Sequence, residues 1–214
     1  MAGRTWGVGV LVAALATHWS APPCGSAQPA GAECVLPDAE SFWERLVSRY
    51  RAIDRYEDEV EVEEIVELAE GSTRYQSKML CSFDGDRVEV VTPGSQLLGL
   101  VRLPCPAKGA RLERTLWTAP HLALRCASDP LAALHAPACG TFMVASIEQA
   151  AQDGVLLARL RLESGDAVFE LTVDVQRMLV VELEATHRLD EGGVMRLRHL
   201  IHPKRVREHP VSRT

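Results

Sequence analysis

A helical pattern of apolar residues lies over residues 38–53. Apolar side chains recur at every third or fourth position, which places them on one face of an α-helix. They are Phe42, Leu46, Tyr50 and Ile53, with Trp43 and Val47 widening the face. Asp38 precedes them and is a suitable N-cap, because its carboxylate can accept hydrogen bonds from free N–H groups of the first turn. The pattern predicts one amphipathic helix that packs on a sheet.

From Tyr56 to Leu68 the period changes from that of a helix to the period of two that is typical of a strand. One face is mostly apolar, although Asp58 and Glu64 interrupt it, and the other is a row of glutamates. A two-residue turn at Glu70-Gly71 predicts a hairpin whose paired residue numbers sum to 141. That register pairs opposite charges and apolar residues: Glu67 with Arg74, Glu63 with Lys78, Val66 with Tyr75 and Val62 with Met79. A third strand, Arg87 to Val91, follows the Asp84-Gly85 turn.

The C-terminal half predicts a second antiparallel meander. Asp153-Gly154 is a strong hairpin signal, and Gly165-Asp166 is the next turn. The two hairpins pair residues whose numbers sum to 307 and 331: Glu148 with Arg159, Ile147 with Leu160, Ala145 with Leu162, Arg161 with Glu170, Leu162 with Phe169 and Leu160 with Leu171. Alternation continues over residues 179–186, and a loop at 191–193 predicts that Leu189 pairs near Met195. Residues 146–152 also suit a short helix, but the register favours a strand.

The middle of the chain, residues 93–140, has the weakest pattern. Gln96 to Leu103 is typical of a strand that Pro104 ends. Ser128-Asp129-Pro130 predicts the start of a short helix over residues 131–135, with Pro130 at its first position. The remainder of this segment has no clean period.

The N-terminus has the features of an export signal. Arg4 precedes the apolar stretch Gly7 to Ala16, and a small-residue cleavage site follows at Gly25-Ser26-Ala27. We therefore expect a signal peptide over residues 1–27, a linker over 28–36, one domain over 37–205 and a tail over 206–214. An uncleaved N-terminal anchor and lipidation at Cys24 are the alternatives. No apolar run is long enough to predict a membrane span in the mature chain.

Composition narrows the classes of protein further. The chain has 214 residues and a net charge of −6, which argues against a nucleic-acid partner, since such proteins usually carry a basic patch. The 24% charged and 47% hydrophobic residues are an ordinary globular mixture. An exported chain can form disulfides, and Cys126 with Cys139 is the predicted pair. The alternative is a set of buried thiols, and cleavage after Ala27 leaves an odd number of cysteines.

The sequence offers no recognisable catalytic or metal-binding motif. It lacks a Gly-x-Ser-x-Gly elbow, a P-loop, a GxGxxG motif and a CxxC pair. His199 and His202 point to opposite faces of a strand, so we interpret them as surface polarity. His121, His135 and His187 are isolated and are interpreted as structural. We therefore expect no enzyme activity, no metal and no cofactor.

These elements predict an α+β fold, an open antiparallel half-barrel made of a single curved sheet. The N-terminal helix and small lid helices would lie against its concave face. This arrangement resembles the LolA-like family of periplasmic lipoprotein carriers, a likeness that covers roughly residues 38–205. Three segments carry the resemblance at corresponding places in the chain: Tyr50–Tyr56 at the helix-to-strand junction, Phe83–Val90 at the turn between the second and third strands, and Ala167–Asp174 in a late strand.

The resemblance implies an exported periplasmic protein of the cell envelope whose apolar cavity holds lipid or lipoprotein acyl chains. The predicted cavity lining is apolar and comes from the helix and both meanders: Phe42, Leu46, Tyr56, Val60, Val62, Val66, Tyr75, Met79, Leu160, Leu162, Phe169 and Leu171. Envelope proteins are the other expected partners. The alternative is a non-enzymatic sensory or protein-interaction domain of the same fold with a collapsed cavity.

The sequence departs from the carriers at one turn. They have a basic residue followed by proline after the second strand, where an arginine helps to hold the lid. Here the turn is Phe83-Asp84-Gly85-Asp86, and Arg87 is not assigned that role. A lipid-binding or sensory relative is therefore the expectation, rather than a lipoprotein shuttle.

Overall fold

The computed structural model describes residues 36–85, 87–93, 100–104, 119–134, 142–165, 167–189 and 192–208. The predicted signal peptide, nearly all of the linker, and Cys139 lie outside these residues. Within them, one N-terminal helix and three short helical segments accompany nine strands. In chain order the elements are α1 Ala39–Ala52, β1 Ile53–Leu68, β2 Gly71–Asp84, β3 Arg87–Val91, β4 Leu100–Pro104, η1 Pro120–Leu122, α3 Ala123–Cys126, α4 Pro130–Ala133, β5 Met143–Gln152, β6 Val155–Ser164, β7 Ala167–Asp174, β8 Leu179–Arg188 and β9 Val194–Glu208.

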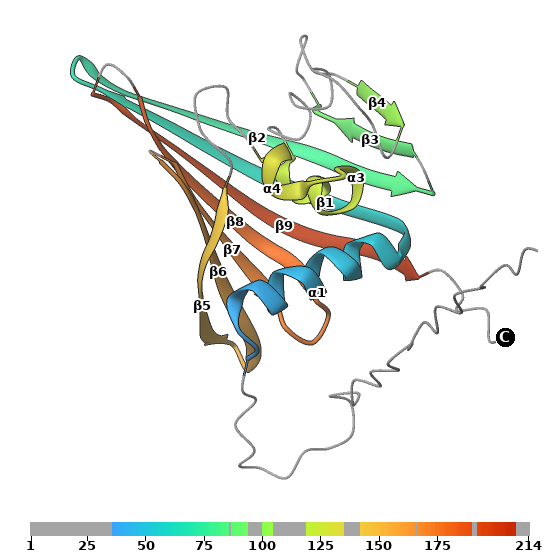
Figure 1. Ribbon diagram of the computed structural model, residues 1–214. Coiled ribbons are helices and arrows are strands. Elements are labelled where there is room, and N and C mark those ends of the chain that lie inside the picture. The colour runs from blue at the N-terminus through green and yellow to red at the C-terminus, as the bar shows by residue number, and fades with distance from the viewer. Residues whose placement is uncertain are drawn as a thin grey trace, which may run out of the picture. The chain divides into compact units, whose positions relative to one another are not determined.

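The strands form a single antiparallel sheet in the order β4-β3-β2-β1-β9-β8-β7-β6-β5. Helix α1 crosses the concave face of this sheet, and α3 and α4 lie on the same side (Figure 1). The sheet is not closed, because β4 and β5 are its two ends. This is the open half-barrel that the sequence predicts.

Helix α1 begins where the sequence predicts it. The Asp38 carboxylate accepts hydrogen bonds from the Ser41 N–H at 2.9 Å and from the Ser41 hydroxyl at 2.7 Å. These bonds lower the pKa of Asp38, because they favour the ionised form. The apolar face of the helix is buried against the sheet. α1 therefore contributes one side of the core.

The predicted register of the first hairpin is wrong by two residues. Paired numbers sum to 139, so that Lys78 pairs with Glu61 and Met79 with Val60, and the turn lies at residues 69–70. A shift of two keeps every side chain on its predicted face, so alternation alone does not distinguish the registers. The observed one stacks Tyr56 on Phe83, with ring centroids 5.1 Å apart in the core. Among the other predicted pairs, Glu67 lies opposite Ser72, Glu63 opposite Gln76, Val66 opposite Thr73 and Val62 opposite Ser77.

The second meander is closer to its prediction. Most residue pairs of the β5–β6 hairpin have numbers that sum to 307, and those of the β6–β7 hairpin sum to 331, as predicted. Residues 146–152 form part of strand β5, which confirms the preferred interpretation. A bulge near Ala145 instead places Val144 opposite Leu162, and Met195 pairs with His187 rather than with Leu189. Asp153 and Gly154 both have positive φ, 51° and 78°, as a type I′ hairpin turn requires.

Strand β9 joins the two meanders, and the sequence did not predict this pairing. It runs antiparallel to β1 from Glu67↔Val194 to Ile53↔Glu208, so this strand continues past the predicted domain boundary at residue 205. A bulge between Glu57 and Asp58 absorbs Lys204 next to Pro203, which explains how a proline is tolerated in a central strand. Gly193 precedes β9, and a Cβ there would lie 2.6 Å from the Glu67 carbonyl oxygen.

The outer face of β1 is an acidic row between basic side chains of β2 and β9. Glu63 pairs with Arg74 and Glu61 with Lys78 on one side, while Arg196 pairs with Glu67 on the other at 3.1 Å. The hydrogen bond from Lys78 lowers the pKa of Glu61 and raises that of Lys78. Exposed pairs are individually weak, but this complementarity favours one order of strands.

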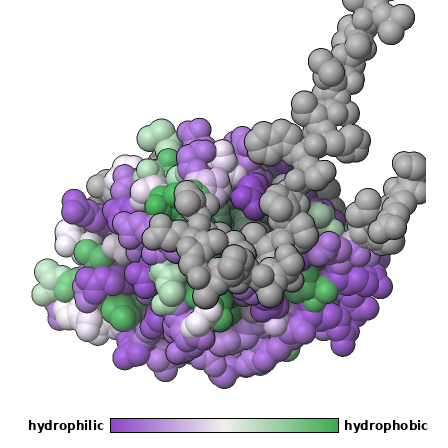
Figure 2. Space-filling model, turned by 90° about the horizontal axis from the view of Figure 1, so that it is seen from below, coloured by the Kyte–Doolittle hydropathy of each residue, from purple (hydrophilic) through white to green (hydrophobic). Residues whose placement is uncertain are grey.

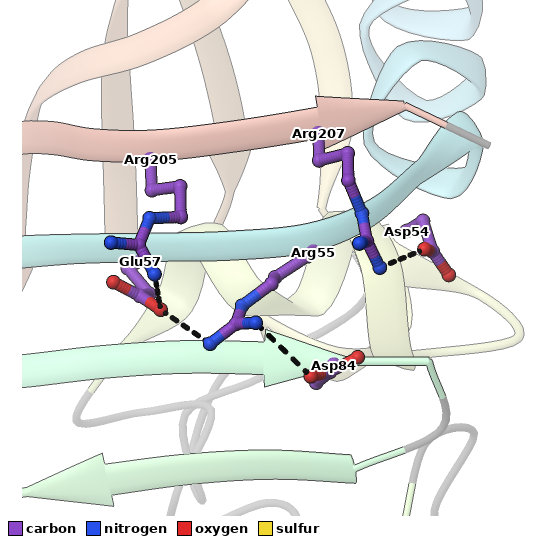
Figure 3. A network of polar contacts seen from close by, with 6 residues as sticks. All are labelled: Asp54, Arg55, Glu57, Asp84, Arg205 and Arg207. Carbon is purple, nitrogen blue, oxygen red and sulfur yellow. Dashed lines mark hydrogen bonds and ion pairs between the residues drawn. The ribbon is translucent and has the colours of Figure 1, made fainter. Parts of the chain in front are cut away.

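The same complementarity continues at the other end of β1 (Figure 3). Arg55 of β1 and Arg205 of β9 both donate to Glu57, each at 3.1 Å. Arg207 donates to Asp54 at 2.7 Å. These contacts tie the end of β9 to the start of β1.

The core face of α1 generates a stability prediction. We expect Leu46→Ala to lower the free energy of unfolding by about 2–5 kcal/mol, because it leaves a cavity in a fully buried site. Leu80→Ala is the matched control, since Leu80 is 49% exposed and such substitutions usually change stability by about 0.5 kcal/mol or less. Urea denaturation measures both, and equal losses would contradict the assigned core.

Candidate functional site

Most of the predicted cavity-lining residues lie together on the concave face, under the helices. Nine of the twelve are buried in one continuous core: Phe42, Leu46, Tyr56, Val60, Met79, Leu160, Leu162, Phe169 and Leu171. The side chains of the sheet and of α1 therefore fill the centre of the half-barrel.

The other three predicted residues lie toward the tip of the β1–β2 hairpin. Val62 and Val66 are partly buried, and Tyr75 is 59% exposed. Tyr75 lies on the same face of β2 as the buried Met79, but the tip of the hairpin projects beyond the helices (Figure 1). Tyr75 is therefore not part of the packed core.

An apolar groove opens at the rim of this core, between α1, α4 and the edge strand β5. It has a volume of about 460 Å³, within the usual range for small-molecule sites. Its apolar lining is Trp43, Leu131, Phe142, Met143, Val144 and Ala145. Met143 is 70% exposed, and in Figure 2 hydrophobic patches stand out on a mainly hydrophilic surface. Sequence reasoning missed this groove, because Phe142 and Met143 follow an unpatterned segment.

Three carboxylates stand around the groove: Glu40 and Glu44 on α1 and Glu163 on β6. Glu163 pairs with Arg161 at 2.6 Å, whereas Glu40 and Glu44 form no ion pair within the described part of the chain. The local charge at the mouth of the groove is therefore negative. It favours a ligand with a neutral or positive polar end.

Two arginines attach the short helices to α1 and to the sheet. Arg125 of α3 donates to the Arg51 carbonyl at 2.8 Å and to the Gly85 carbonyl at 3.1 Å. Arg51 in turn donates to the Ser128 carbonyl at 3.1 Å. Arg125 also lies over the Phe83 ring, 5.7 Å from its centroid. Arg125, which lies on helix α3, therefore holds the short helices in place. The turn after β2 contributes the Gly85 carbonyl that accepts one of its hydrogen bonds.

A polar cluster lies in the core beneath η1. Asp58, Cys81 and His121 are all buried, and the His121 Nε2 lies 2.8 Å from an Asp58 carboxylate oxygen. Burial raises the pKa of the Cys81 thiol, and the negative charge of Asp58 raises it further. The sequence held one signal of this cluster, the interruption of an apolar strand face by Asp58.

His199 is also buried, so its interpretation as surface polarity is wrong. The β1–β9 pairing places it on the inner face, opposite Val62, whereas His202 is exposed. Burial lowers the pKa of His199 to about 3, and the charge of His121 contributes. The isolated His121 proved to be a core residue, as its structural interpretation implies. Cys126 is buried, and its predicted disulfide stays a prediction.

The comparisons with known proteins give likenesses of fold. No protein-family model and no curated protein matches the chain. A LolA superfamily protein from Nitrosomonas europaea is 11% identical, with 82% of this chain and 96% of that chain covered and a TM-score of 0.27. A putative outer membrane lipoprotein-sorting domain from Vibrio parahaemolyticus is 8% identical, with 80% and 92% covered and a TM-score of 0.29.

A third likeness is to MucB in its complex with MucA(peri), at 14% identity and a TM-score of 0.33. The match covers 80% of this chain and 58% of the MucB chain, so this chain spans little more than half the length of that protein. No helix in the described residues is long and apolar enough to cross a membrane.

The buried His199 generates a pH prediction. The unfolded state takes up a proton near pH 6.5, whereas the folded state does so only near pH 3. The contribution of His199 to the free energy of unfolding is therefore constant well above pH 6.5. Below pH 6.5 it falls with decreasing pH, by up to about 1.4 kcal/mol per pH unit. We expect His199→Leu to show a shallower loss between pH 6.5 and 4 in urea titrations. His202→Gln on the same strand is the control, and equal slopes in all proteins would refute the assignment.

The arginine contacts generate a second prediction. We expect Arg125→Met to speed hydrogen exchange in residues 119–134, because two hydrogen bonds to backbone carbonyls are lost while the apolar stem remains. Arg45→Met, an exposed change on α1, should leave that exchange unchanged. Mass spectrometry of peptic fragments measures both, and unchanged exchange in Arg125→Met would show that packing alone holds the segment.

Proposed function

We propose that this chain is an exported, non-enzymatic protein of the cell envelope that binds the acyl part of a lipid or lipoprotein. The observation that carries the proposal is the apolar groove at the rim of the half-barrel, with Met143 exposed within it. An exposed apolar groove with few polar groups is typical of a ligand site. The predicted N-terminal signal peptide supports a periplasmic location, and the sequence resemblance supports the class of ligand.

The groove is where an acyl chain would enter. Burial of apolar area contributes roughly 25 cal/mol per Å², and Met143, which is 70% exposed, offers such area at the edge of the filled core. A longer chain would need space among the predicted lining residues, which requires α1 or the short helices to move. The acidic mouth favours ligands whose polar end is neutral or cationic.

The filled core favours a second candidate function, a protein-interaction or sensory domain. Among the described strands, β5 pairs with β6 alone and forms one edge of the sheet, so its other side can accept a strand from a partner. That partner would place apolar side chains in the adjoining groove. This role needs no movement of the helices.

The two candidates differ in what the purified protein carries. We expect native mass spectrometry of protein exported to a periplasm, and purified without detergent, to show a bound mass of lipid or acyl size. A bare mature chain that also fails to bind a hydrophobic dye would contradict lipid binding. Recovery of one stoichiometric polypeptide partner in place of lipid would favour the interaction domain.

A substitution in the groove tests its location. We expect Met143→Glu to weaken binding of an uncharged fluorescent fatty alcohol by about tenfold or more, because it places a charge where the groove offers apolar contact. Leu80→Glu is the matched control, since it adds the same charge at an exposed apolar position outside the groove. Equal affinities for the two variants would place the ligand elsewhere.

A further inference from the structure

Among the described residues, three potential metal ligands come together in the interior of the protein: Asp58 of β1, Cys81 of β2 and His121 of η1. One ligand atom from each lies within 4.8 Å of the others. Asp58 and Cys81 are direct partners in the β1–β2 register, and η1 brings His121 down onto them. Three separate elements therefore converge on one point.

These polar groups lack the hydrogen bonds that buried groups normally make. Within the described part of the chain, neither Asp58 oxygen and neither His121 nitrogen has a well-aligned hydrogen-bond partner, although the Tyr56 hydroxyl and the Cys81 thiol both face Asp58. The 2.8 Å approach of Nε2 to the carboxylate is therefore an approach without hydrogen-bond alignment. Buried polar groups without well-aligned hydrogen bonds are costly, and a cation shared by the carboxylate, the imidazole and the thiol would satisfy them.

The kinds of ligand identify the class of ion. A thiolate, an imidazole and a carboxylate are the ligands typical of zinc, whereas magnesium and calcium prefer sets of oxygen atoms. Zinc–ligand bonds of about 2.0–2.3 Å place neighbouring ligand atoms about 3.3 Å apart in a tetrahedron. The His121–Asp58 gap needs to open by only about half an ångström.

We propose that Asp58, Cys81 and His121 bind a zinc-class divalent ion that fastens η1 to strands β1 and β2. Binding requires the Cys81 thiol to lose its proton, and the cation stabilises the resulting thiolate. A nucleophilic role for Cys81 fits less well, because this thiol is buried and its raised pKa disfavours the reactive thiolate. The site is separate from the apolar groove and does not depend on the proposed lipid function.

The test uses the whole protein after removal of metal by a chelator. We expect a titration with zinc, in competition with a chromophoric chelator, to show one ion per chain. Cobalt should give a sulfur-to-metal charge-transfer band, which only a thiolate ligand produces. Cys81→Ser should abolish that band and weaken zinc binding by at least about 100-fold, because loss of even an outer-shell partner costs about 10- to 100-fold.

His202→Gln is the matched control, because it removes an exposed imidazole and should leave binding within about twofold. If the circular dichroism of Cys81→Ser differs from that of the unsubstituted protein, Asp58→Asn and His121→Gln each remove another proposed zinc ligand and replace it in the test. Zinc should also raise the thermal midpoint of the unsubstituted protein and of His202→Gln, since the ligands converge only in the folded state. Substoichiometric zinc in the unsubstituted protein, or undiminished binding in the folded cluster variants, would overturn the proposal.

Discussion

The pairing of β1 with β9 is the interaction on which the rest of this structure depends. Each meander alone would leave a long strand edge open, and exposed edges invite non-specific pairing. The β1–β9 ladder runs from Ile53↔Glu208 to Glu67↔Val194 and turns two meanders into one curved sheet. Its outer face sets the glutamates and aspartate of β1 against arginines of β9, and its inner face sets Val60 opposite Ile201. Charge and burial thus select the same register.

Strand β1, which lies between β2 and β9, also positions groups that hold the helices. Asp58 approaches His121 of η1, and Tyr56 stacks on Phe83, over which Arg125 lies. The Gly85 N–H donates to the Asp54 carbonyl at 2.9 Å while the Gly85 carbonyl accepts from Arg125. The placement of the helical segment is therefore linked to the register of β1 and β2. A slip of two residues would preserve the faces of the strands and destroy these contacts.

The sequence predicted the parts of the fold that depend on local patterns. The α1 cap at Asp38, the Asp153-Gly154 turn and the β6–β7 register each follow from residues close together in the chain. The β1–β9 pairing did not follow, because it joins segments more than a hundred residues apart, although the basic outer face at Arg196 and Arg198 complements the acidic row. The misinterpreted His199 has the same cause, since its burial depends on which strand lies beside it. At the candidate site, the packed lining was predicted from periodicity, whereas the groove depends on the fold around β5.

The filled core and the peripheral groove suggest how such a fold can hold a ligand and remain folded without one. A half-barrel lined by large apolar side chains would expose a wide apolar face if nothing filled it. Here α1 and residues such as Phe169 and Leu160 fill the centre, so a ligand of the proposed kind that reaches past the groove would compete with the protein's own packing. Its affinity would then depend on how easily the helices leave the sheet, because displacing α1 costs the burial that it provides. Contacts that hold the helices, whether Arg125 with Gly85 or the cluster under η1, therefore set the free energy of opening. Under the proposed function, stronger contacts of this kind would make ligand binding weaker and ligand release easier.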